Sequence, residues 1–384
     1  MSLNTTQWDA IVIGAGPAGS LSAYLLASEG FRTLLTDRAE FPRPKLCGGC
    51  LAPAGQHVLR RAGLVSASDL DDAPAIDRLD LQSGNQRTRL RVPGYRVVDR
   101  RDFDANLVAA AQKAGTVFRG RTSASLEASG LVGIRDDAGD SGGELVRTRI
   151  VVVADGLKGT SLDTDPRFSW IIKENNLVGL GAIAHKLPTG CAPDAITMFH
   201  GVHGYLGVAP LSKGRADIAA AVSPGWLRQN RAGPPLVSLA GSLGLDLMAA
   251  DCEITMPGSP HLTRRRSRVE ADGTVFLCGD AAGYVEPFTG EGMTWALTAA
   301  ERLSPRLREA LAGHYSHGAW TRDLKAESRR RRILCRSVGS MLRKPRVTRA
   351  VIAACESLPP FRNAVSGMLA AFHAERNSTA AGVA

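Results

Sequence analysis

The sequence predicts an α/β fold in which a nucleotide-binding domain is discontinuous and carries an inserted sheet. Three observations predict it. Residues 8–38 have the pattern of strand, glycine-rich turn, helix and strand. Two later buried-type strands, "RIVVVADG" and "GTVFLCGD", end in an acid and a glycine, and the strands and turns of residues 170–222 lie between them. The class is therefore a Rossmann-like domain with an inserted, mostly antiparallel β-sheet domain and a C-terminal helical region.

The length of 384 residues is too great for one simple core. We expect the nucleotide-binding domain to use residues 1–74, 97–165 and 270–313. The inserted substrate domain takes residues 75–96 and 166–269, and a basic helical region takes residues 314–384.

The composition is that of an ordinary soluble protein, with 44% apolar and 22% charged residues. The polar N-terminus "MSLNTTQWDA" lacks the features of a signal peptide, which predicts a cytoplasmic protein. The seven cysteines are an odd number without framework spacing, and this indicates reduced thiols.

The whole net charge of +10 falls in residues 301–384, which hold 16 basic and 6 acidic residues. This region includes the run "SRRRR" at 328–332. Such a region can contact nucleic acid or anionic lipid, or form a solvated helical face. The scarcity of aromatic residues favours the solvated face over nucleic acid. Peripheral membrane contact stays open as an alternative, and the oligomeric state is not predicted.

The first glycine-rich turn, "GAGPAG", has the spacing G-x-G-x-x-G between a strand and a helix. Gly14 permits the tight turn, and Gly16 lets the backbone approach a pyrophosphate. Gly19 lets the helix pack closely on the strand. This context predicts a dinucleotide site at the N-terminus of the helix.

Two further pairs of residues belong to this predicted dinucleotide site. Pro17 and Ala18 begin the helix, where proline suits the first turn. Asp37 and Arg38 stand at the end of the next strand, where an acid can accept from ribose hydroxyls. An acid at this position opposes a 2′-phosphate, so the tightly held nucleotide is FAD or NAD rather than NADP.

Later glycine-containing segments favour FAD over NAD. Asp280 follows a buried-type strand and can hold a sugar-alcohol hydroxyl. Gly290 and Gly292 open a helix whose apolar side includes Met293. The free N–H groups there can stabilise negative charge on a ring carbonyl, which a reduced flavin carries and NAD does not.

Together the stretches "GAGPAG", "FPRPKLCGG", "DRRDFD", "ADG" and "GDAAGYVEPFTGEGM" resemble FAD-dependent oxidoreductases of the aromatic-hydroxylase superfamily, and within it the geranylgeranyl reductase-like group. The resemblance spans residues 11–300. It implies FAD as cofactor, NAD(P)H as a transient co-substrate and a hydrophobic small-molecule substrate. It also implies roles for Asp37 at the adenosine ribose, Arg100 at FAD, Asp155 and Gly156 between FAD and NAD(P)H, Asp280 at the ribityl–pyrophosphate portion, and Gly290, Gly292 and Met293 at the flavin edge.

The stretch "KLCGGC" raises the alternatives of a redox dithiol, a metal knuckle and a flavin-side loop. No second C-x-x-C occurs, so we expect no metal site. The resemblance implies that Cys47 is the motif position beside the flavin, as a proton donor or pocket wall, and that Cys50 is incidental. Inert packing and a working dithiol stay open.

The substrate sheet departs from the resembling group, whose members carry a Tyr-x-Trp-x-Phe-Pro element. The corresponding stretch here is "GYLGVAP", in which Tyr205 is kept as a candidate catalytic residue. Gly207 and Ala209 replace the two large rings. We expect a pocket that is wider than, or shaped differently from, one that fits a geranylgeranyl group, and the same loss argues against a flavin halogenase.

Three functional hypotheses follow. The first is an FAD- and NAD(P)H-dependent reductase of a double bond in an isoprenoid- or polyketide-like substrate. The second is a monooxygenase that uses O₂ and shares every cofactor motif. The third is an electron-transfer flavoprotein bound to a membrane or a partner, which no cluster-type cysteine set supports.

Overall fold

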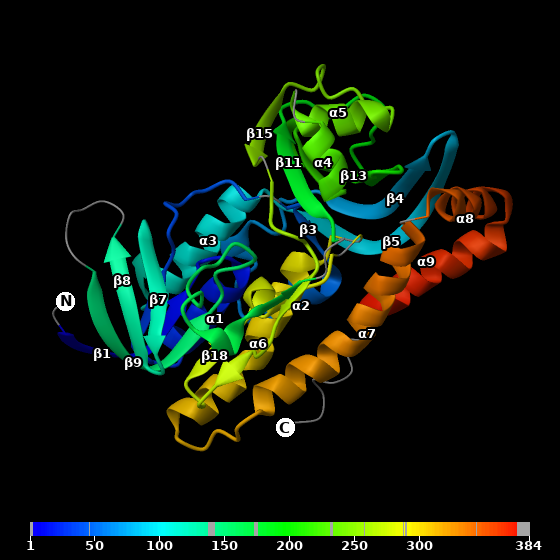
Figure 1. Ribbon diagram of the computed structural model, residues 1–384. Helices are drawn as coiled ribbons and strands as arrows, with labels where there is room; N and C mark the ends of the chain where they lie inside the picture. Colours follow the sequence, from blue (N-terminus) through cyan, green and yellow to red (C-terminus); the bar gives the residue numbers. More distant parts are fainter. Residues whose placement is uncertain are drawn as a thin grey trace.

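The computed structural model describes residues 3–45, 47–136, 143–172, 176–230, 233–256, 258–286, 288, 290–342 and 344–374. Two large sheets organise these residues. The first sheet contains the N-terminal strand, and the second sheet lies next to the C-terminal helices (Figure 1).

The first sheet has the strand order β17-β18-β9-β1-β2-β6, and a β7–β8 hairpin attaches to β9. The pairs β1–β2, β1–β9, β9–β18 and β2–β6 are parallel. Its central strands are continuous apolar runs because helices and loops cover both faces. The strands are β1 (Leu3–Ile13), β2 (Thr33–Thr36), β6 (Val117–Arg119), β7 (Thr122–Ala128), β8 (Leu131–Asp136), β9 (Glu144–Val153), β17 (Glu270–Ala271) and β18 (Val275–Leu277).

Three helices cover one face of this sheet, α1 (Pro17–Ser28), α3 (Arg100–Lys113) and α6 (Gly292–Leu311), and α1 contacts both of the others. Leu21, Phe103 and Leu297 are buried in the shared core. The N-terminal ends of α1 and α6 bring the first and last glycine-rich turns of the sequence to one cavity. This is how a discontinuous chain assembles one site.

The second sheet has the order β15-β11-β14-β13-β12-β4-β5-β3 and is antiparallel except where β12 pairs with β4. Helix α4 (Pro224–Gln229) and helix α5 (Pro235–Ser242) lie in the segment between β14 and β15, and Leu236, Leu239 and Ala240 of α5 pack on one face of the sheet. Its strands are β3 (Cys50–Leu51), β4 (Ala75–Ser83), β5 (Gln86–Val97), β11 (Val178–Ala184), β12 (Ala195–His200), β13 (Gly204–Pro210), β14 (Ala216–Val222) and β15 (Cys252–Met256).

A small third sheet joins the two halves through β10 (Trp170–Ile172), β16 (Arg264–Arg266) and β19 (Gly283–Tyr284). Helix α2 (Pro53–Arg61) follows β3 and packs against α6. These elements confirm the predicted α/β class with an inserted, mostly antiparallel sheet.

The C-terminal region is helical, as expected. Helix α7 (Ala319–Leu342) runs past α6 toward the second sheet, where α8 (Pro345–Ser357) and α9 (Pro359–Ala374) pack on β5 (Figure 1). The side chains of 328–332 lie outside the described residues. Within the residues described, no helix is both long and apolar enough to span a bilayer.

Candidate active site

One cavity of about 460 Å³ lies between the two large sheets. Of the site residues predicted from the sequence, only Gly19 is not part of its lining. The others that line it are Gly14, Gly16, Pro17, Ala18, Asp37, Arg38, Cys47, Arg100, Asp155, Gly156, Tyr205, Asp280, Gly290, Gly292 and Met293.

The first glycine turn forms one end of the cavity, at the N-terminus of α1. Gly14 has a φ of +99°, and a Cβ there would lie 2.5 Å from the Ala154 carbonyl oxygen. A Cβ on Gly19 would lie 1.8 Å from the Gly14 oxygen, so this glycine serves helix packing. A Cβ on Gly16 would meet only a guanidinium nitrogen of Arg43, at 4.0 Å. The space beside Gly16 is therefore open to a ligand.

Asp37 lies at the same end and is tied to the backbone. Its carboxylate accepts from the Ala15 N–H at 2.8 Å and from the Ala39 N–H at 2.9 Å. The Arg43 guanidinium lies 3.8 Å away. The carboxylate is thus held in one orientation at the cavity wall, while Arg38 next to it is exposed.

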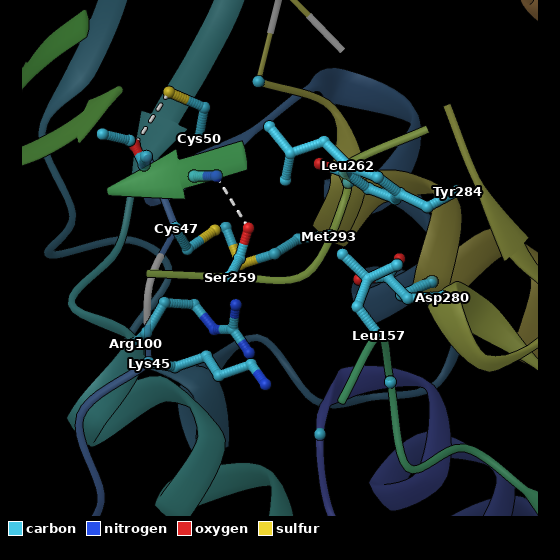
Figure 2. Close-up of a pocket in the computed structure, with 18 of the residues that line it drawn as sticks. Lys45, Cys47, Cys50, Arg100, Leu157, Ser259, Leu262, Asp280, Tyr284 and Met293 are labelled. Carbon is cyan, nitrogen blue, oxygen red and sulfur yellow. Dashed lines mark hydrogen bonds between the residues drawn. The ribbon is translucent and has the colours of Figure 1, made fainter. Parts of the chain in front are cut away.

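A cluster of cations forms the middle of the cavity. Arg100 is the first residue of α3 and donates to both oxygens of the buried Asp104, at 2.8 and 2.7 Å. Arg43 lies 3.4 Å from the same carboxylate, and Lys45 lies beside Arg100 (Figure 2). The three cations share the nearby carboxylates of Asp104, Asp37 and Asp280. Because the cations lie close together, this part of the wall suits an anionic ligand.

Lys45 and Asp280 both have shifted pKa values. Burial, with repulsion from Arg43 and Arg100, lowers the pKa of Lys45 to about 8. Burial raises the pKa of Asp280 to about 6, against the attraction of Lys45 and Arg100. Each group is poorly solvated, and each is the other's partial counter-charge.

Asp155 serves the local turn. One of its carboxylate oxygens accepts from the Ser161 N–H at 3.1 Å and from the Ser161 hydroxyl at 2.6 Å. The other oxygen is buried and accepts no hydrogen bond within the described part of the chain. Gly156 follows with a φ of +75°, and a Cβ there would lie 3.9 Å from the Lys45 amine. The pair therefore shapes the wall facing Lys45.

The last glycine turn closes over the thiol loop. Gly290 has a φ of +73°, and a Cβ there would lie 3.0 Å from the Cβ of Cys50. A Cβ on Gly292, the first residue of α6, would lie 3.3 Å from the Tyr284 ring. Both glycines are needed for close packing, and the buried Met293 follows them.

The two thiols differ in surroundings (Figure 2). Cys50 is buried in β3, and its thiol donates to the Gly48 carbonyl oxygen at 3.0 Å. Cys47 is half-buried at the cavity wall. Burial raises the pKa of the Cys47 thiol, although a hydrogen bond and the charge of Arg100 oppose the shift. Both cysteines are free thiols.

The far end of the cavity is apolar and is formed by one face of the second sheet. The Tyr205 ring packs edge-on against Phe288, with ring centroids 5.2 Å apart. The Tyr205 hydroxyl hydrogen-bonds to Glu286, and burial together with this carboxylate raises the pKa of Tyr205 well above its usual value. Leu369 of α9 also lines this end.

Small residues form the floor at the same end. Gly207, Ala209, Ala219 and Ala221 all line the cavity. A Cβ on Gly207 would lie 2.7 Å from the sulfur of Met198, so Met198 fills part of the space a larger residue would take. The floor is therefore flat and apolar.

Four residues of the site were missed by sequence reasoning: Arg43, Lys45 and Glu286 line the cavity, and Asp104 is buried behind Arg100. Arg43 and Lys45 stand inside the quoted stretch "FPRPKLCGG", and their charge was the available signal. Asp104 lies in "DRRDFD", four residues after Arg100. Glu286 had no sequence signal, because it follows β19 in a loop and its partner Tyr205 lies in β13, far away in the sequence. No group of metal-binding side chains occurs among the described residues.

Comparison with known proteins supplies the family. A model described as an FAD binding domain matches residues 7–205, more than half of the chain. A digeranylgeranylglycerophospholipid reductase from Methanopyrus kandleri is 30% identical over 305 residues, which are 76% of this chain and 78% of that protein.

Solved structures agree on the fold. A geranylgeranyl bacteriochlorophyll reductase-like protein from Thermoplasma acidophilum has a TM-score of 0.69 at 18% identity, covering 90% of this chain and 91% of that one. The flavin-dependent brominase Bmp2 has a TM-score of 0.76 at 17% identity, covering 95% and 93%. At such identities these likenesses concern the fold alone. Together with the matched domain and the archaeal relative, the cavity identifies this chain as a member of the FAD-dependent oxidoreductases of the geranylgeranyl reductase-like group.

Proposed function

We propose that the protein uses NAD(P)H to reduce bound FAD, and then reduces a carbon–carbon double bond in a hydrophobic, isoprenoid- or polyketide-like substrate. The observation that supports this most is the single cavity that joins a nucleotide-type glycine turn to an apolar sheet face. The similarity to a protein named a digeranylgeranylglycerophospholipid reductase supports the choice of reaction.

The residues present fit FAD. In the proposal, the open space beside Gly16 at the α1 N-terminus takes the pyrophosphate, where N–H groups and the helix dipole favour negative charge. Asp37, already oriented by two backbone N–H groups, accepts from the adenosine ribose. Asp280 accepts from the ribityl–pyrophosphate portion. When bound, FAD supplies the hydride that the chain's own residues cannot provide.

The cation cluster stabilises negative charge in the middle of the cavity. Arg100 is fixed by Asp104 and cannot turn away, so its charge is preorganised. Lys45 adds a second cation that is mostly protonated at neutral pH and loses its proton as the pH rises through a pKa of about 8. In the proposal, Asp155 and Gly156 form the wall on the side where NAD(P)H enters.

Cys47 is the better proton donor of the two candidate catalytic residues. Burial keeps its thiol protonated, and it lines the cavity beside Arg100. The thiol donates its proton to one carbon of the double bond as the hydride reaches the other, and solvent later restores the proton. Tyr205 is a poor acid because its pKa is raised well above the usual value. Its hydroxyl is held by Glu286, so its role is to orient the substrate.

The floor of small residues suggests a substrate of broad cross-section. Gly207 and Ala209 stand where the resembling group carries large rings, and Ala219 and Ala221 extend the same surface. Most of the other side chains at this end are apolar, so the fit to a substrate rests mainly on shape and burial of apolar area, with the Tyr205–Glu286 pair as a polar contact.

The test is NAD(P)H consumption by the purified holoenzyme with and without O₂, using polyprenyl and polycyclic polyketide substrates. A reductase consumes NAD(P)H without O₂ in equal amount to a product that gains two hydrogens. Consumption that requires O₂, with an oxygenated product, establishes the monooxygenase instead. Flavin reduction without any small-molecule product supports the electron-transfer alternative.

A further inference from the structure

We propose that the helical hairpin of α8 and α9 docks on the surface of an anionic lipid bilayer. This docking surface consists of Val347, Leu358, Phe361 and Met368 with the basic residues beside them. It lies at the end of the molecule away from the first sheet (Figure 1). The identity of the substrate drawn from the bilayer rests on the proposed function, whereas the docking itself does not.

The docking surface exposes large apolar side chains. Leu358 is 55% exposed, Met368 49%, Val347 44% and Phe361 40%. Phe361 and Met368 are seven residues apart in α9 and therefore lie on one side of the helix. Isolated exposed apolar residues are ordinary, but four within 22 residues of one helical hairpin indicate an interaction site.

These exposed side chains are not the residues with which the two helices pack on the sheet. The inner sides of α8 and α9 already carry a buried set, Ile352, Cys355 and Leu369. Both helices pack on β5, and Cys355 and Leu369 belong to the core that covers the sheet. The outward apolar residues are therefore additional to those that hold the hairpin in place.

The charge around the surface matches anionic lipid. Residues 344–374 contain four basic residues and one acidic residue. Lys344, which precedes α8, and Arg346 and Arg349 on α8 are exposed, and Arg362 on α9 is half-buried next to Phe361 in the sequence. Basic side chains near anionic headgroups stabilise binding, while apolar side chains enter the boundary of the acyl chains.

A second copy of this chain is a less suitable occupant. A two-fold contact would place each copy's Arg346 and Arg349 against the same patch of the other, and like charges repel. An anionic bilayer meets both properties of the surface at once. It also needs no spanning segment, and no described helix could supply one.

The position connects the bilayer with the cavity. Leu369 lies on the inner side of α9 and lines the apolar end of the cavity. Met368, the residue before it, points about 100° around the same helix and is 49% exposed. A bilayer on the docking surface would be about one helix diameter, roughly 10 Å, from the cavity wall. A substrate that resides in lipid would then leave the bilayer next to its binding site.

The experiment is co-sedimentation of the holoenzyme with phosphatidylglycerol–phosphatidylcholine vesicles and with pure phosphatidylcholine vesicles. The apolar variant is Leu358→Ser/Phe361→Ser, and the charge variant is Arg346→Gln/Arg349→Gln. The control is Met248→Ser, which changes an apolar residue that is 76% exposed far from the hairpin. Thermal unfolding and bound flavin confirm that each variant is folded.

We expect the wild type to bind the anionic vesicles and to be released by salt. The apolar variant loses roughly tenfold in partitioning for each side chain removed. The charge variant loses about fivefold for each arginine, only at low salt. Met248→Ser binds like the wild type. The proposal is overturned if the wild type ignores anionic vesicles, or if the apolar variant binds as the wild type does.

Light scattering measures the oligomeric state and so tests whether a second copy of the chain occupies the docking surface. A dimer that both hairpin variants dissociate would assign the surface to a second copy and overturn the proposal. Failure of docking is distinguishable from failure of the proposed function. Reduction of a detergent-solubilised substrate tests the proposed function without vesicles. Co-sedimentation with vesicles tests docking without any substrate.

Discussion

Replacement of Gly16 by valine should abolish FAD binding and leave the fold intact. Gly16 has φ of −75° and ψ of −178°, an extended conformation that valine adopts readily. Its Cβ would lie in open space, with the nearest protein atom 4.0 Å away on Arg43. The apoprotein therefore accommodates valine, but the branched side chain occupies the proposed pyrophosphate path.

The magnitude follows from the contacts that valine would displace. Loss of two charge-assisted hydrogen bonds, at about 1.5–3 kcal/mol each, weakens FAD binding by at least about 100-fold. Gly19→Val is the matched control. Its Cβ would lie 1.8 Å from the Gly14 oxygen, so this variant should lose about 3 kcal/mol of folding free energy or more.

The assays are the ratio of flavin to protein absorbance after purification and thermal unfolding of the apoproteins. We expect Gly16→Val to be colourless with a wild-type apoprotein melting temperature, and Gly19→Val to unfold at a lower temperature. The reasoning is refuted if Gly16→Val keeps full FAD occupancy, or if its apoprotein is as unstable as that of Gly19→Val.

Three further predictions concern the middle and far end of the cavity. The folded state raises the pKa of Asp280 from 3.8 to about 6, so its ionisation destabilises the fold increasingly as the pH rises from about 4 to 6, and has no such effect below pH 4, where it is protonated in both states. Asp280→Asn should therefore raise the melting temperature of the FAD-free protein at neutral pH but not at pH 4. The same variant should weaken FAD binding about tenfold to 100-fold. Equal melting curves of wild type and variant at neutral pH would contradict the first expectation. Cys47→Ser should lower turnover or divert electrons to peroxide with fast flavin reduction retained, while Cys50→Ser stays near normal; an uptake of four rather than two electrons in anaerobic titration would instead show a dithiol. Tyr205→Phe loses the bond to Glu286 and should raise KM more than it lowers kcat, and a selective loss of kcat would show that its hydroxyl takes part in the chemistry.

The sequence predicted those parts of the fold and site that are encoded locally. The turn of Gly14 to Gly19 has a fixed spacing because one strand and one helix must meet there. The same holds for Gly290 and Gly292, which open α6. Such motifs placed the nucleotide end and the α/β class without any knowledge of long-range contacts.

Features that depend on tertiary contacts could not be predicted. Asp104 gains its role from being buried between Arg100 and Arg43, which lie on different elements. The short helices α4 and α5 were not predicted, because "SPGWLRQNRAGPPLVSLAGS" is rich in glycine and proline. Each begins with a proline at its first turn, and this was the available signal.

The most direct test of the account is a single turnover without oxygen. The holoenzyme is reduced by one equivalent of NAD(P)H, mixed anaerobically with a polyprenyl or polyketide substrate, and followed by flavin absorbance and product mass. The account predicts that the substrate reoxidises the flavin and that the product gains two hydrogens. A flavin that stays reduced until O₂ is admitted, followed by a product that gains one oxygen atom, would contradict it.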